Sequence, residues 1–152
     1  MSHVRTQIKK AALAALQAQA GLENICHIDR DDEFAVEEMP AVNLHSIKSV
    51  EANEPLTMNR NGTERRTFQM FVDCYARYTS NVIHGVDDLA ALVEKALLKL
   101  PSPQLDPLVQ RIVLSSTGTD KDPSADVSVA QARLTFEVTY LIKGGVPDVA
   151  IR

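Results

Sequence analysis

The chain has few aromatic and glycine residues, and it lacks the short motifs that identify most enzyme classes. Its 152 residues include no Trp, four Phe, three Tyr and only six Gly, so the core must be built from Val, Leu, Ile and Ala. No dinucleotide-binding GxGxxG, P-loop, HExxH or GxSxG motif is present, which gives no support to the enzyme classes that these motifs mark. No apolar run approaches the ~20 residues of a membrane-spanning helix.

Cysteine is also scarce, with two residues that show no CxxC spacing. Cys26 and Cys74 lie far apart in the sequence, and we expect two free thiols in a reducing compartment rather than a disulfide. Cys74 falls on the apolar side of an alternating segment. A small inert hydrophobic residue is therefore the favoured interpretation there, and a catalytic nucleophile the alternative.

Charge of one sign does not dominate either. The formal net charge is −4, which gives no basic footprint for wrapping nucleic acid. Hydrophobic residues make up 45% of the chain and charged residues 24%, which are ordinary values for a folded globular protein. The length predicts a single domain over residues 1–152.

Two segments have helical periodicity. In residues 3–19, Val4, Ile8, Ala12 and Leu16 fall on one face, which predicts an amphipathic helix. A second apolar stripe runs through residues 81–100, with Asp87 and Asp88 expected in its first turn and Pro101 after its end.

Alternation with a period of two predicts the strands. The clearest alternating segments are 66–78 and 127–143; shorter candidates cover 25–28, 41–50 and 111–120. The Asn61-Gly62 pair predicts a turn in a long hairpin over residues 52–64. We therefore expect an α+β fold: a mixed, mostly antiparallel sheet of four to five strands, with two main helices packed on one face. Residues 146–152 are left either as a C-terminal arm onto a neighbour or as a frayed end.

Residues that bind metals occur without ligand spacing. His27, Asp29, Asp31 and His45 form an imaginable site, but isolated polar surface residues are the favoured interpretation. The acidic segment 29–38 lacks the alternation and the Gly of a calcium loop, so it is interpreted as a solvated turn. We expect no cofactor, no metal and no catalytic residue.

One charge asymmetry carries a hypothesis about assembly. Six acids lie between Asp29 and Glu38, whereas the hairpin is basic. Charge balance between loops of one chain is the favoured explanation. The alternative is a contact between copies, which closes into a ring when it is head-to-tail. The candidate interface residues are Asp31, Asp32, Glu33, Arg65 and Arg66, with Met58, Arg60 and Asn61 at the hairpin tip.

The order of segments resembles the tail terminator and tail completion proteins of tailed phages, the minor tail protein U-like group. The features are "VRTQIKKAALAAL", "MPAVNLHSI", "RRTFQMFVDCYARY", "VDDLAALVEKALL", "LSSTGTD" and the closing "AQARLTFEVTYL". The resemblance covers nearly the whole chain in pattern and order.

The resemblance implies a structural protein of the virion tail, encoded by a phage or prophage and assembled in the host cytoplasm. Such proteins form rings, often hexamers, that cap the tail tube, end its polymerisation and meet the head connector or a neck protein. DNA passes through the ring without sequence recognition, and no membrane is involved. The alternatives are a head-completion or neck protein of the same joint, a small enzyme, or a ligand-binding domain.

Overall fold

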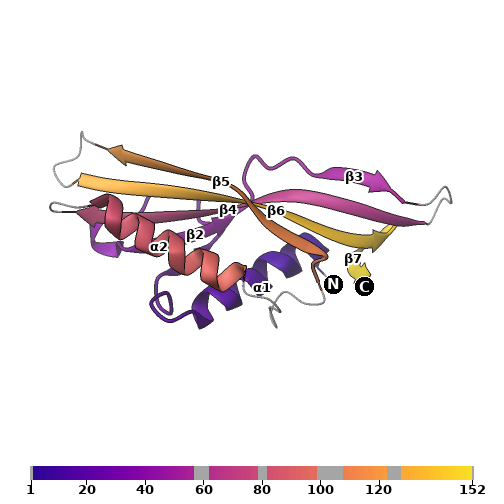
Figure 1. Cartoon of the computed structure of the whole chain (residues 1–152). Coiled ribbons are helices and arrows are strands. Elements are labelled where there is room, and N and C mark those ends of the chain that lie inside the picture. The colour runs from indigo at the N-terminus through magenta and orange to yellow at the C-terminus, as the bar shows by residue number, and fades with distance from the viewer. Residues whose placement is uncertain (1, 57–61, 79–81, 99–107, 123–127, 152) are drawn as a thin grey trace.

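The computed structural model describes residues 2–56, 62–78, 82–98, 108–122 and 128–151. These residues form two helices and seven strands in a single sheet (Figure 1). In chain order the elements are α1 (Val4–Ala18), β1 (Cys26–Ile28), a 3-10 turn at Val36–Glu38, β2 (Ala41–His45), β3 (Ala52–Pro55), β4 (Thr63–Tyr78), α2 (Val82–Leu97), β5 (Arg111–Asp122), β6 (Ser128–Lys143) and β7 (Val146–Ile151).

The centre of the sheet is the antiparallel pair β4 and β6, each 16 residues long. Their pairing sets Phe68 opposite Val138 and Val72 opposite Leu134, and residues that are directly opposite share a face. The predicted inward rows are confirmed, since the following side chains are all buried: Phe68, Met70, Val72, Cys74, Ala76, Ala132, Leu134, Phe136, Val138, Tyr140 and Ile142.

Shorter strands flank this pair end to end, so the sheet has two halves. One half has the strand order β1-β2-β4-β6-β5, and in the other half β3 pairs with β4 while β7 pairs with β6. We call these the five-strand half and the four-strand half. Residues 46–51 connect β2 to β3 along the edge of β4, and Lys48 in this linker has a positive φ of 63°. The strand predicted over residues 41–50 therefore ends at His45.

The α+β class is confirmed, but the sheet is larger and more mixed than expected. It has seven strands rather than four to five, and β1 runs parallel to β2. The two strands that the sequence does not predict, β3 and β7, contain only four and six residues. Such short segments show little periodicity, and each contains a proline, Pro55 or Pro147.

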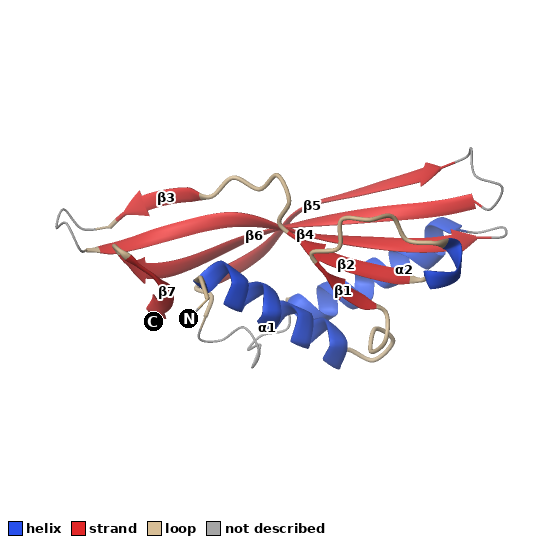
Figure 2. Ribbon diagram, turned by 180° about the vertical axis from the view of Figure 1, so that it is seen from behind, coloured by secondary structure: helices blue, strands red, loops and turns tan. Residues whose placement is uncertain are grey.

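Both helices lie on the same face of the curled sheet (Figure 2). We call this side the helix face and the other side the open face. Val4, Ile8 and Leu16 of α1 are fully buried, as are Val93 and Leu97 of α2. Burying each such side chain contributes roughly 1.5–3 kcal/mol before entropy is counted. Since α2 begins at Val82, Asp87 and Asp88 lie beyond its first turn, contrary to expectation.

The C-terminal residues are part of the sheet. Val146–Ile151 form β7, which pairs antiparallel with β6 after a turn in which Gly145 has a φ of +82°. The two termini lie side by side (Figures 1 and 2), and Gln7 donates a hydrogen bond to the carbonyl of Asp148. None of the helices in the described ranges is long and apolar enough to cross a membrane.

Candidate functional site

The open face of the five-strand half carries a hollow of about 430 Å³. Its floor consists of side chains that point away from the helices on β2, β4 and β6, and the loop after β1 forms one wall. The lining residues are Arg30, Asp31, Asp32, Glu33, Asn43, His45, Ile47, Lys48, Phe71, Asp73, Tyr75 and Arg133.

Asp73 is the centre of this floor, and its side chain is only 3% exposed. Arg133 lies directly opposite on β6 and donates two hydrogen bonds to the carboxylate, at 2.7 and 2.9 Å. His45 Nε2 lies 2.8 Å from the second carboxylate oxygen. Burial by itself raises the pKa of Asp73, but the hydrogen bonds from His45 and Arg133 outweigh burial and hold the pKa below its ordinary value.

His45 has both ring nitrogens engaged. Nδ1 accepts a hydrogen bond from the backbone N–H of Ile47 at 3.3 Å, so Nε2 carries the hydrogen that is donated to Asp73. The Asp73 carboxylate therefore accepts three hydrogen bonds from two side chains, and both ring nitrogens of His45 have partners. The arrangement fixes the positions of all three side chains.

Arg133 is the exposed member of the cluster, at 48% of its side-chain surface. Its guanidinium lies 5.2 Å from the centre of the Phe71 ring. A second hollow of about 440 Å³ begins on the far side of Arg133, over Gly118 and Gln131. The open face is thus indented on both sides of this one cation.

The loop that forms the wall is held by Arg30. Its guanidinium pairs with Asp32 at 3.0 Å and Glu38 at 2.6 Å, and lies 4.0 Å from the centre of the Phe34 ring. The Asn43 side chain bonds to both backbone groups of Arg30. Among the predicted interface residues, Asp32 is therefore paired within the loop, whereas Asp31 and Glu33 have no ion pair with any described residue.

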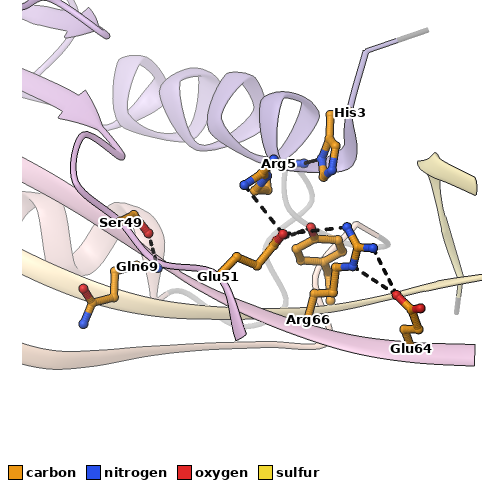
Figure 3. A network of polar contacts seen from close by, with 8 residues as sticks. His3, Arg5, Ser49, Glu51, Glu64, Arg66 and Gln69 are labelled. Carbon is orange, nitrogen blue, oxygen red and sulfur yellow. Dashed lines mark hydrogen bonds and ion pairs between the residues drawn. The ribbon is translucent and has the colours of Figure 1, made fainter. Parts of the chain in front are cut away.

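A second polar cluster lies on the helix face of the four-strand half (Figure 3). Tyr140 donates a short hydrogen bond to Glu51, which also lies 3.6 Å from Arg5 of α1 and 3.7 Å from Arg66. Arg66 in turn bonds to Glu64 at 3.0 Å. Burial, and then the bond to Glu51, raises the pKa of the Tyr140 hydroxyl well above its ordinary value.

The predicted basic residues separate onto different faces. Arg66 lies inside the Glu51 cluster with its side chain 18% exposed, whereas Arg65 points to the open face, is 39% exposed and pairs with Glu54 at 3.2 Å. Met58, Arg60 and Asn61 fall outside the described residues. Arg65 also lies far from the hollow. It is eight residues along β4 from Asp73 in the floor of the hollow, a distance of about 26 Å at 3.3 Å per residue. Among the described residues, no ion pair joins the acidic loop to the hairpin. Arg30 pairs with Asp32 and Glu38, Lys9 of α1 pairs with Asp29, and Arg65 pairs with Glu54.

The other candidate groups are placed apart from one another. His27 contacts the Phe34 ring, Asp29 pairs with Lys9 at 3.0 Å, and His45 binds Asp73. Cys26 and Cys74 are free thiols. Burial raises the pKa of Cys74 to about 12 and that of Cys26 to about 11, so both stay protonated near neutral pH.

Sequence reasoning did not identify the Asp73 and Glu51 clusters. A usable signal for the first was present, because Asp73 and Arg133 are opposite charges on the outward rows of two strands whose inward rows are apolar. Aligning those rows places the two residues opposite each other. No comparable signal existed for Glu51, which comes from an irregular linker.

No protein-family model matches the chain, and no curated protein matches it.

Proposed function

We propose that this chain is a structural assembly protein that forms a ring, caps a phage tail tube, ends tube polymerisation and presents a surface for head joining. The proposal combines the resemblance in segment order with one structural observation. The exposed acids and the partly exposed hairpin arginine lie in different halves of the same long sheet.

That separation suits a head-to-tail contact between copies. A ring requires two different, complementary surfaces on each subunit. Asp31 and Glu33 offer unpaired negative charge at the rim of the hollow in the five-strand half. Arg65 offers partly exposed positive charge in the four-strand half, and Arg60 belongs to the same hairpin in sequence. One copy's hairpin beside the next copy's acidic rim brings opposite charges together.

The location of Arg66 determines how this proposal is tested. Reversing Arg66 would place a third carboxylate beside Glu51 and Glu64 and damage the subunit itself. The informative variants are therefore Arg65→Glu and the double change Asp31→Lys with Glu33→Lys, while Lys95→Glu on the exposed side of α2 is the matched control.

Electron microscopy and light scattering of the purified protein, alone and with polymerised tail-tube protein, measure the outcome. Each set of variants should abolish rings and tube capping, and mixing the two sets should restore them, because one charge-reversed interface then becomes complementary. The control should behave as the parent. Rings that survive both reversals would reject this interface, and a failure to cap tubes under any condition would reject the function.

A small-molecule binding domain is the second candidate, because the 430 Å³ hollow is within the usual ~300–1,000 Å³ of ligand sites. Its lining carries seven charged side chains, whereas ligand pockets are mostly apolar. The ring therefore remains the better-supported proposal.

A further inference from the structure

The edges of the sheet differ in how well they are protected against pairing with another strand. β1 contains three residues; β3 contains four and ends in Pro55; β7 carries Pro147. β5 contains twelve residues without a proline, and its outer edge has no strand partner among the described residues. Natural proteins shorten, charge or interrupt their edge strands to avoid unwanted pairing. Among the described edge strands, only β5 is both long and free of proline.

The second part of β5 is exposed on both faces as well as along its edge. The six residues Ser115 to Asp120 are all exposed, including Thr117 and Thr119, which share the helix face with Leu134 and Ala132. The helices therefore do not cover this part of the strand. An uncharged Ser-Ser-Thr-Gly-Thr segment with free edge groups is a template for strand addition.

We propose that β5 pairs antiparallel with β5 of a second copy about a two-fold axis. A second copy fits because of the length of the strand. Among the described strands at an edge of the sheet, only β5 has twelve residues with an unpaired edge, so only another β5 matches it along its whole length. A two-fold contact uses the same surface on both copies, so it needs no other edge.

The bulge in β5 allows both faces to match in this pairing. Before the bulge, Ile112 and Leu114 are on the helix face; after it, Thr117 and Thr119 are. With the axis between Ser115 and Ser116, Leu114 lies opposite Thr117 and Ile112 opposite Thr119. The same register sets Arg111 opposite Asp120 on the open face, twice by symmetry, so the charges are complementary.

Two adjacent proline substitutions test the pairing. Successive N–H groups of a strand point to opposite edges, so one of Thr117→Pro and Gly118→Pro removes an outward donor and the other removes a bond to β6. In the Arg65→Glu background, in which the proposed ring contact is removed, the chain should be a dimer by light scattering. One proline variant should keep the parent's circular dichroism spectrum and thermal midpoint and become a monomer; the other should lose thermal stability.

Cysteine cross-linking gives a second readout that does not depend on the proline variants. Ser116→Cys, next to the axis, should form a disulfide-linked dimer under mild oxidation, at a yield at least about tenfold above the matched control Asn53→Cys on the exposed β3 edge. This follows because a disulfide requires Cα atoms within ~7 Å.

A monomer at high concentration in the Arg65→Glu background, or a dimer that survives in the correctly folded proline variant, would overturn the inference. Equal cross-linking in Ser116→Cys and Asn53→Cys would do so too. The contact is separate from the head-to-tail surfaces of the proposed ring, so loss of β5 pairing leaves Arg65 and the acidic rim intact, and the two proposals fail independently.

Discussion

Asp73 and Glu51 are both carboxylates that bond to basic side chains, but the elements that supply their partners differ. The partners of Asp73 come from β2 and β6, the strands on either side of β4. Sheet pairing alone brings them together. The partners of Glu51 come from α1, β4 and β6, and Glu51 itself belongs to the linker after β2. That cluster forms only when the helix and the linker have docked.

A charge that is largely buried can therefore stabilise either the pairing of strands or the docking of a helix, depending on which elements supply its partners. The Asp73 cluster forms when the strands pair, and it supports a surface hollow. The Glu51 cluster forms only when α1 and residues 46–51 pack on the sheet. Changes in the first should therefore affect the whole fold, and changes in the second should act mainly on local opening.

The largest effect is expected for Asp73→Ala. The change leaves the buried Nε2–H of His45 without its acceptor, and losing a buried hydrogen bond to a charged group costs about 1.5–3 kcal/mol. Arg133 adds less to the loss, because its side chain is 48% exposed and water can solvate the freed guanidinium. Urea unfolding followed by circular dichroism measures the free energy of unfolding. Asp88→Ala on the exposed side of α2 is the control and should cost less than about 0.5 kcal/mol. A loss below 1 kcal/mol for Asp73→Ala would mean that the cluster does not stabilise the sheet.

A smaller effect is expected for Tyr140→Phe. The ring keeps its packing against Phe68, and Glu51 keeps Arg5 and Arg66. The main loss is the hydrogen bond from the hydroxyl to Glu51, at about 1–2 kcal/mol. Hydrogen exchange should quicken in α1 and residues 46–51 more than in β4 and β6. Uniformly faster exchange across the sheet would contradict the division into a sheet cluster and a docking cluster.

The sequence was sufficient where side chains follow a period. The inward rows of β4 and β6, the buried face of α1 and the pairing of β2 with β4 were all predictable, because each depends on repeated apolar positions that must be buried together. The strands that the sequence did not predict, β3 and β7, are short and weakly patterned, and they owe their pairing to tertiary context rather than to their own residues.

The candidate site was less predictable for a related reason. Arg65 and Arg66 are adjacent basic residues in the sequence, yet the pleat sends them to opposite faces, one exposed and one held by Glu51 and Glu64. The sequence shows that both residues are positively charged, but it does not show which carboxylates pair with them. Which arginine is available depends on the linker that delivers Glu51, and nothing periodic marks that residue.

The acidic limb of the stability curve distinguishes the clusters further. The pKa of Asp73 is depressed in the folded state, so its contribution is present above the unfolded value of about 3.9 and is lost as the pH falls through the folded pKa. Asp73→Asn removes this dependence. The difference in unfolding free energy between pH 7 and pH 3 should be smaller in Asp73→Asn than in the parent, and unchanged by Tyr140→Phe. An equal slope in the parent and in Asp73→Asn would exclude Asp73 as its source.

The smallest expected effect is on the alkaline limb, and it belongs to the other cluster. The folded pKa of Tyr140 is raised by burial and by Glu51, so its contribution is full below the unfolded value of about 10 and is lost as the pH rises above it. Cys74 adds to the same limb, since its pKa is raised to about 12. Between pH 9 and pH 11, Tyr140→Phe should lose stability less steeply than the parent, and Asp73→Asn should lose it as steeply as the parent. If Tyr140→Phe follows the parent over this range, the hydroxyl ionises as freely in the folded chain as in the unfolded one, and the contact with Glu51 is not maintained in solution.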